Sequence, residues 1–218
     1  MIHGQLPPIN KDDDNHLLDA PHIFLDEIMR QAAESEIIQL SMKIRAGEPI
    51  PYMKGKEVQV IKKEELSTGM LLWADQILCA TNRTRVDLNN QMRELLGRGE
   101  KPEDGDKVIC LRNYWENLSE NEESALVNGT IGYLKNCYDS FFLIPQKLKP
   151  NVPRIDIINA DFVSDTNETF PNLVMDKKLI LEGENSLDWK TSFKLSKSKF
   201  YNYLVPKEFT YGYAITRS

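Results

Sequence analysis

Three polar side chains follow a short apolar run near the middle of the chain. Residues 76–80 have the composition of a buried strand, and the run stops at Thr81, Asn82 and Arg83. Polar residues in that position lie at the carboxyl edge of a parallel sheet, which is where open α/β sheets bind their ligands. Thr81 or Asn82 is also suited to cap the helix expected after it. The same short polar groups can contact phosphates or sugars of a nucleic acid, and the two roles are compatible.

The sequence lacks several motifs that carry catalysis. It contains no glycine-rich phosphate loop of the GxxxxGK(S/T) type, no GxSxG nucleophile elbow and no HExxH zinc motif. Its three cysteines, at positions 79, 110 and 137, form no CxxC pair. Because the whole chain has only three histidines, we expect no metal site. On the residues alone, the chain is expected to be a binding or regulatory domain rather than a complete enzyme.

The composition is ordinary for a globular protein. Hydrophobic residues make up 41% and charged residues 28%, so disorder is not expected. The net charge of −6 argues mildly against a nucleic-acid partner, although a local basic groove is enough to grip a single strand. Basic residues do cluster, at 83–98 and 190–199. The apolar runs are too short to cross a bilayer and no secretory signal is visible, so we expect no membrane partner. The odd, sparse cysteine count fits a reducing cytosol, so we expect a cytoplasmic protein.

Helical and strand patterns alternate in the first half of the chain. Apolar residues at helical spacing predict helices at 22–31, 35–45, 66–74 and 86–96, and Ser35 is placed to cap the second of these. A short strand is expected at 58–61. The strand at 76–80, its polar loop and the helix at 86–96 form the clearest α/β unit.

The pattern changes after Pro102. Asn128-Gly129 is a typical hairpin-turn signal. Several short strands separated by turns favour a small β-barrel. The expected strands are residues 108–111, 130–134, 141–144, 155–158, 179–181 and 193–195.

Five segments resemble, in the same order along the chain, the motifs of superfamily-one DNA helicases of the RecD and Dda type, the exodeoxyribonuclease V alpha-subunit-like enzymes. Gly4-Gln-Leu-Pro-Pro-Ile9 resembles the family's GDxxQLPPI motif, and Leu25–Gln31 resembles the motif that follows it. Ile77–Asn89 is similar to LxxTNxxVxxLN. The other two matches are Gly105–Val108 with Leu126–Gly132, similar to GDKV…NGxxG, and Tyr211–Thr216, similar to the start of YAxTxHKxQG.

This resemblance implies a fold and a domain organisation. Residues 1–127 would be the first part of the second RecA-like motor domain, a parallel-sheet α/β fold. Residues 128–207 would be an inserted small SH3-like β-barrel, and 208–218 the return strand of the RecA-like domain. The chain would be a fragment of an ATP-dependent helicase that moves on single-stranded DNA, with five-prime to three-prime polarity, in DNA repair or recombination. Its partners would be single-stranded DNA and the missing first RecA-like domain.

The resemblance also implies site residues. Gln5 would lie beside the ATP γ-phosphate, and Arg30, with Gln31, would reach it from the second domain. An arginine suits that role because it is always charged and donates in a fork. Thr81, Asn82, Arg83, Asn128 and Thr216 would contact DNA. ATP with magnesium would bind only the intact parent, so no cofactor is expected on this fragment, which should not hydrolyse ATP alone.

The sequence departs from the family pattern in several places. Met1-Ile-His3 replaces the residues expected before the glutamine motif, and no His-Lys-x-Gln-Gly follows Thr216. An adaptor with an SH3-like, peptide-binding barrel is therefore kept as the alternative. Its groove would use the aromatic side chains of Tyr201, Tyr203, Phe209 and Tyr211.

Other large or charged side chains are expected to have structural roles. Trp73, Trp115 and Trp189 are expected to pack in the core or the barrel rather than stack on bases. The lysines between residues 190 and 199 are expected to form a solvated face, with a DNA-facing barrel edge as the alternative.

Overall fold

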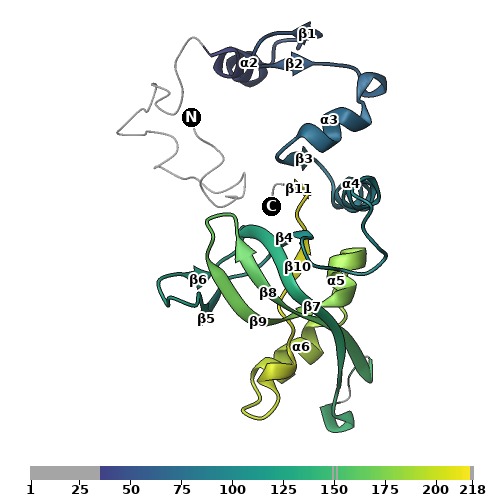
Figure 1. Cartoon of the computed structure of the whole chain (residues 1–218), viewed down its shortest axis with the longest axis vertical. Coiled ribbons are helices and arrows are strands. Elements are labelled where there is room, and N and C mark those ends of the chain that lie inside the picture. Colours follow the sequence, from purple (N-terminus) through teal and green to yellow (C-terminus); the bar gives the residue numbers. More distant parts are fainter. Residues whose placement is uncertain (1–34, 149, 151, 217–218) are drawn as a thin grey trace, which may run out of the picture. The chain divides into compact units, whose positions relative to one another are not determined.

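The computed structural model describes residues 35–148, 150 and 152–216, and the chain divides into two units, residues 1–66 and 67–218. The expected helix at 22–31 lies outside the described residues, as do Gln5, Arg30 and Gln31. Figure 1 shows the elements of each unit.

The described part of the first unit is a helix beside a small hairpin. It contains α2 (Glu36–Arg45), β1 (Met53–Lys54), β2 (Gln59–Val60) and the 3-10 turn η1 (Lys63–Glu65). The Ser35 hydroxyl accepts a hydrogen bond from the Ile37 amide at 3.3 Å, which confirms the expected cap. The Glu36 carboxylate accepts from the amides of Glu57 and Val58, at 2.9 and 3.2 Å, and so ties the helix to the hairpin.

The second unit contains a pair of parallel strands flanked by helices. Its elements are α3 (Thr68–Trp73), β3 (Ile77–Cys79), α4 (Asn82–Leu95) and β11 (Ala214–Thr216). β3 and β11 run in parallel, with Ile77 opposite Ala214, and α4 packs against both strands. The expected strand, its helix and the α/β class are thus confirmed. Burial of β3 was expected but is incomplete, because Leu78 in its centre is 76% exposed.

The helix after β3 begins four residues earlier than its apolar pattern predicts. The Thr81 side chain accepts a hydrogen bond from the Thr84 amide at 3.2 Å and caps α4 at its first turn. The polar residues 82–85 therefore belong to the helix. Hydrophobic periodicity could not locate this start, because it detects only the part of the helix that faces the core.

An antiparallel sheet lies between α4 and β11 in the sequence. Its strand order is β10–β4–β7–β8–β9. The expected strands at 108–111, 130–134, 141–144 and 155–158 all fall within it. The sheet extends across residue 128, the expected start of the insert, because β4 precedes that residue. The bounds are β4 (Lys107–Cys110), β7 (Ile131–Leu143), β8 (Arg154–Ser164), β9 (Thr169–Asp176) and β10 (Phe209–Tyr211).

The sheet curls but does not form a continuous hydrogen-bonded ring among the described residues. The Lys207 amide donates to the Val174 carbonyl at 2.7 Å, and the Asp176 amide donates to the Lys207 carbonyl at 3.1 Å. This single bridge joins β9 to the segment that leads into β10. The contact goes no further, since β9 ends at Asp176, and the Glu208 carbonyl accepts from the Leu111 amide beside β4 instead. The closed SH3-like barrel expected from the sequence is therefore not shown.

Asn128 and Gly129 form a turn, as expected, but the strands on either side do not pair with each other. The Thr130 amide donates to the Val127 carbonyl at 3.2 Å, and the Gly129 amide donates to the Cys110 carbonyl at 2.8 Å. The preceding β6 (Ala125–Leu126) pairs with β5 (Tyr114–Leu118), whereas β7 pairs with β4. The turn therefore leads the chain from one strand pair into another sheet.

Two segments expected to be strands are helices. Residues 179–181 lie in α5 (Lys177–Glu182), and 193–195 lie in α6 (Trp189–Ser196). Aspartates start both helices: Asp176 accepts from the Leu179 amide, and Asp188 accepts from the Thr191 amide. These N-caps decide the local structure, because short apolar runs alone do not distinguish a strand from a helix. The remaining short turns are η2 (Gln146–Leu148) and η3 (Asn202–Leu204).

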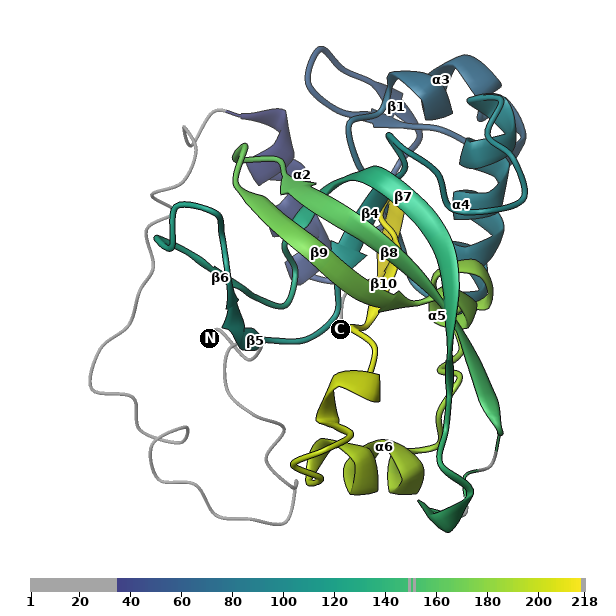
Figure 2. The same ribbon diagram turned by 60° about the horizontal axis from the view of Figure 1, so that its bottom comes forward.

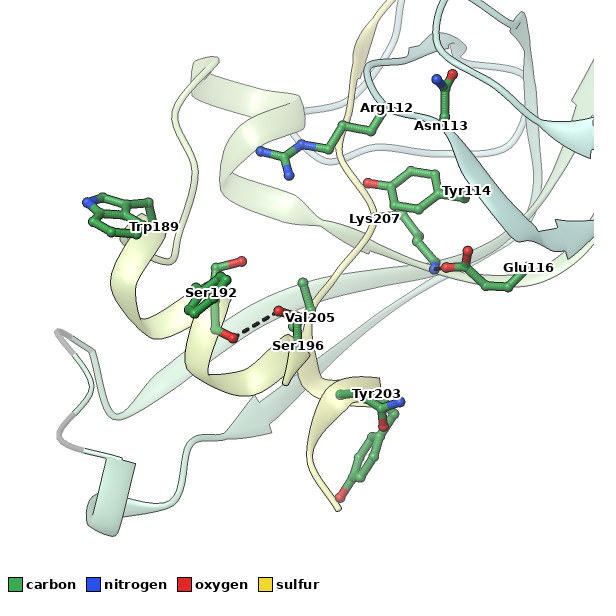
Figure 3. A pocket seen from close by; sticks show the side chains of 12 residues that line it. Arg112, Asn113, Tyr114, Glu116, Trp189, Ser192, Ser196, Tyr203, Val205 and Lys207 are labelled. Carbon is green, nitrogen blue, oxygen red and sulfur yellow. Dashed lines mark hydrogen bonds and ion pairs between the residues drawn. The ribbon is translucent and has the colours of Figure 1, made fainter. Parts of the chain in front are cut away.

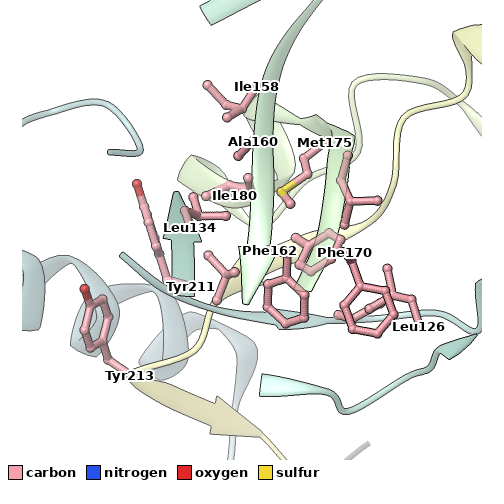
Figure 4. Close-up of a cluster of buried hydrophobic side chains, with 14 of the residues drawn as sticks. Leu126, Leu134, Ile158, Ala160, Phe162, Phe170, Met175, Ile180, Tyr211 and Tyr213 are labelled. Carbon is pink, nitrogen blue, oxygen red and sulfur yellow. The ribbon is translucent and has the colours of Figure 1, made fainter. Parts of the chain in front are cut away.

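The second unit has two buried apolar clusters. The larger one fills the concave side of the antiparallel sheet and extends to α3 and α4, and Figure 4 shows part of it. Phe162 is central, with the rings of Phe170 and Phe209 at centroid distances of 6.0 and 5.2 Å. The smaller cluster lies under α6 and η3 and includes Leu195 and Leu204. The first cluster supports the strand pair and the sheet together, and the second supports α6. Figure 2 shows the ribbons of the sheet and of α6 from a second direction.

Candidate nucleic-acid interface

Four of the predicted site residues meet at the carboxyl edge of the parallel pair. Thr216 ends β11, and its hydroxyl donates to the side-chain oxygen of Asn82 at 3.1 Å. Thr81 and Arg83 lie beside Asn82 at the start of α4, and these three residues are exposed. Two segments that are 134 residues apart in the sequence are thus joined at one polar edge. We call this group, Thr81, Asn82, Arg83 and Thr216, the polar edge.

The polar edge has a positive electrostatic character. The first turn of α4 contains no acidic residue, and the free N–H groups and dipole of a helix start favour anions. Arg83 adds an exposed cation. Arg85, in the same turn, is half-buried and forms no ion pair with a described residue, and its burial lowers the pKa of the guanidinium. Arg85 belongs to the basic cluster at 83–98, but it was not among the residues expected to contact DNA.

Asn89 holds β11 in position beneath this edge. Its side-chain nitrogen donates to the carbonyls of Tyr211 and Ala214, at 3.1 and 2.9 Å. Its side-chain oxygen accepts from the Ala214 amide at 2.8 Å. Gln76 adds bonds from its side chain to the carbonyls of Gly212 and Tyr213, at 3.0 and 3.1 Å. Together they fix the segment where the chain passes from β10 to β11.

A buried ion pair lies next to this clamp. Arg93 donates through two nitrogens to the Asp106 carboxylate, each at 3.1 Å, and also to the Lys101 carbonyl at 2.6 Å. Tyr213 donates to the same carboxylate at 3.1 Å, and Arg93 lies 4.5 Å from the centre of the Tyr211 ring. Burial lowers the pKa of Arg93, but the hydrogen bond that Arg93 donates to Asp106 and the nearby charges together outweigh burial, so the pKa is raised. The network is enclosed, so its role is to position β11 rather than to bind a ligand.

Asn128 is not part of the polar edge. Its backbone amide donates to the Asn113 side chain at 2.8 Å, on the turn before β7. Among the described residues, no contact joins it to Thr216 or Asn82. Its side chain is exposed, so a DNA contact at Asn128 would belong to a separate surface.

No part of the expected nucleotide site is described. Gln5, Arg30 and Gln31 lie outside the described residues, so their roles stay predictions. Within the described residues, no group of three or more His, Cys, Asp or Glu side chains could hold a metal ion. The chemistry available at the polar edge is therefore hydrogen-bond donation and positive charge, which suit a phosphate backbone.

The aromatic residues differ from the sequence-based expectations. Phe209 and Tyr211, two members of the proposed peptide groove, are buried in the core. Tyr203 is exposed. The three tryptophans do not pack in the core or the barrel as expected, since Trp73, Trp115 and Trp189 are 86, 67 and 72% exposed. Sequence gave no indication of this, because tryptophan is usually largely buried.

Comparisons with known proteins identify no family. No protein-family model matches this chain, and no curated protein matches it. Among the helices of the described residues, none is long and apolar enough to span a bilayer.

Proposed function

We propose that this chain is part of an ATP-dependent DNA helicase motor and that its polar edge contacts the backbone of single-stranded DNA. The observation that carries the proposal is the hydrogen bond between Thr216 and Asn82. These residues belong to two segments that resemble separate motifs of the RecD and Dda type helicases. Thr216 ends the parallel strand β11, and Asn82 begins the helix that follows its partner strand β3. The resemblance to these helicases is better supported when motifs that are far apart in the sequence lie on one surface.

The topology supports the finer fold proposal. β3, α4 and β11 would belong to the sheet of a second RecA-like domain. The antiparallel sheet lies between α4 and β11 in the sequence and would be the SH3-like insert. Asn89 and Gln76 hold the segment that connects the insert to β11. A DNA strand bound by the insert would therefore move together with a DNA strand bound by the polar edge.

The polar edge has the groups that a nucleic-acid backbone requires. Thr81, Asn82 and Thr216 offer short polar groups, Arg83 and Arg85 supply positive charge, and the start of α4 offers backbone amides. Such contacts position a strand without reading its bases. We expect binding to depend on salt and to be largely independent of base sequence.

The nucleotide chemistry belongs to the intact motor. ATP with magnesium would be bound by residues of the first RecA-like domain, and this chain would contribute Gln5, Arg30 and Gln31. The chain alone would not hydrolyse ATP. Translocation from five-prime to three-prime and a cytoplasmic location belong to the same proposal. The peptide-binding adaptor loses support because Phe209 and Tyr211 are buried.

Titration of a labelled single strand tests the proposal. Arg83→Ala should weaken binding at every base sequence and lower the steepness of the salt dependence by roughly 0.7, the value for one phosphate contact on a single strand. Arg45→Ala, which removes an exposed helix arginine of the first unit, is the matched control and should bind as the unaltered chain does. Equal affinities and salt slopes for both variants would show that the polar edge does not bind DNA.

A further inference from the structure

A large groove lies away from the polar edge, between α6 with η3 on one side and the β5 segment on the other. Its volume is about 700 Å³. Figure 3 shows Trp189 and Tyr203 on the helical side and Arg112, Tyr114 and Glu116 on the other. We call it the α6 groove. Its size is ample for one or two planar rings, and nothing in the proposed function uses it so far.

The helical side of the α6 groove presents aromatic rings to solvent. Trp189, Phe193 and Tyr203 are 72, 55 and 63% exposed, and the rings of Trp189 and Phe193 lie 6.5 Å apart between centroids. The opposite face of α6 is anchored by Thr191 and Leu195, which are buried. The helix is thus fixed in a single orientation, and its aromatic face is turned outward. Exposed large apolar groups that gather in this way mark an interaction site.

Positive charge borders these rings. The helical repeat places Lys190 and Lys197 next to the Trp189–Phe193 face, and both lysines are exposed. The Lys197 ammonium lies 5.6 Å from the centre of the Phe193 ring. Lys194 and Lys199 add two more exposed cations to the same short segment.

Within the groove the charges on the other side are already paired. Arg112 contacts Glu208 at 2.8 Å, and Lys207 contacts Glu116 at 3.1 Å. The Glu116 carboxylate of the groove is therefore balanced, and Lys190 and Lys197 add positive charge beside the rings at the border of the groove. A negatively charged polymer fits this surface better than a neutral or a positively charged one.

We propose that the α6 groove binds single-stranded nucleic acid, with bases stacked on Trp189 and Phe193 and phosphates beside Lys190 and Lys197. Stacking on exposed rings next to cations is the chemistry of single-strand recognition, because unpaired bases offer both faces to aromatic side chains. A duplex hides those faces. The inference rests on the proposed function, since it gives the same strand a second surface, but it depends on different residues.

The test is a titration of the chain with a labelled oligothymidine of roughly 12 nucleotides, within the site sizes of single-strand binding folds. Trp189→Ala and Phe193→Ala should each weaken binding by roughly 5- to 100-fold, the effect of losing one stacked base. Trp189→Phe should retain most of the affinity, since it keeps a ring. Trp73→Ala removes a tryptophan on α3 that is even more exposed than Trp189 and should leave binding unchanged.

A second arm examines charge and separates the groove from the polar edge. Lys190→Gln with Lys197→Gln should lower the steepness of the salt dependence by roughly 0.7 for each lysine. If Trp189→Ala weakens binding and Arg83→Ala does not, the groove inference stands and the polar-edge proposal fails. If only Arg83→Ala weakens binding, the groove inference is overturned and the polar edge stands. A proline-rich peptide that displaces the oligonucleotide and binds more tightly than it does would also overturn the groove inference.

Discussion

At the scale of single residues, Asn89 is a polar side chain of α4 that holds the backbone leading into β11. It is buried and makes three hydrogen bonds to the backbone of residues 211–214. We predict that Asn89→Ala lowers the free energy of unfolding by at least about 2 kcal/mol, because it leaves buried backbone groups without partners. Urea denaturation, followed by circular dichroism, measures the change.

Its neighbour supplies the control for that prediction. Asn90→Ala removes the same side chain one position along the helix, where it is exposed, and should change stability by no more than about 0.5 kcal/mol. Equal unfolding midpoints for the two variants would mean that the bonds from Asn89 do not hold β11.

Sequence predicts such residues only when the signal is local. Thr81 or Asn82 was expected to cap the helix, and Thr81 does so, because a cap depends on residues three positions away. The bond between Thr216 and Asn82 could be anticipated only through the resemblance, since no local rule joins residues so far apart. The exposure of Trp189 could not be predicted, because it depends on which face of α6 the Leu195 side chain buries.

At the scale of elements, β7 is the strand on which the antiparallel sheet depends. It pairs with β4 on one side and β8 on the other. Gly132 lies where both partners approach, and a Cβ there would lie 2.7 Å from the Ser164 Cα and would also clash with the Val163 carbonyl. A methyl group would force β7 and β8 apart. We therefore predict that Gly132→Ala prevents folding of the second unit or lowers its stability by more than about 3 kcal/mol.

Gly129 gives a contrast within the same motif. It has a φ of 89° and no neighbour within 4 Å of an added Cβ, so Gly129→Ala should cost only the backbone strain of about 1 kcal/mol. Thermal unfolding of both variants distinguishes a packing effect from a turn effect. Similar losses for the two would refute the close-approach explanation for Gly132.

Element type was predictable where caps and periodicity agree, and not where they conflict. α2, with Ser35 as its cap, was expected and is present. The short apolar runs at 179–181 and 193–195 predict strands, although Asp176 and Asp188 stand at helix-capping positions before them. The caps were the stronger signal, because a carboxylate at that position satisfies a free amide of the first turn.

At the scale of the whole molecule, the mixed α/β class followed from the order of elements, but the form of the antiparallel sheet did not. Local patterns predicted four of its strand segments. Whether the sheet closes depends on the contact of Lys207 with Val174, which lies 33 positions away and ends after one bridge. The burial of β3 likewise depends on how the elements pack in the folded molecule. The exposed Leu78 shows that amino-acid composition alone overestimates this burial.

The last prediction concerns the intact motor and the residue expected to act on ATP. In a longer protein that contains a phosphate loop, Arg30→Ala should lower ATP turnover by a large factor while barely changing single-strand affinity. Arginines placed against a transferring phosphoryl group contribute roughly 10³–10⁵ in rate, whereas single-strand binding is shared among many backbone and stacking contacts. Arg30→Lys should recover only part of the rate, because a point charge cannot replace the planar fork.

Arg83→Ala is the reciprocal control for Arg30→Ala in that protein, since the two residues are assigned to different ligands. It should weaken DNA binding and raise the DNA concentration needed for half-maximal turnover, yet leave turnover near normal once DNA is saturating. Steady-state ATPase assays and salt-controlled DNA titrations on the same preparations measure both effects. If Arg30→Ala hydrolyses ATP at the normal rate, or if it loses DNA affinity as steeply as turnover, the segment Leu25–Gln31 does not have the helicase role. The polar edge would then have to be explained as a nucleic-acid surface without a motor.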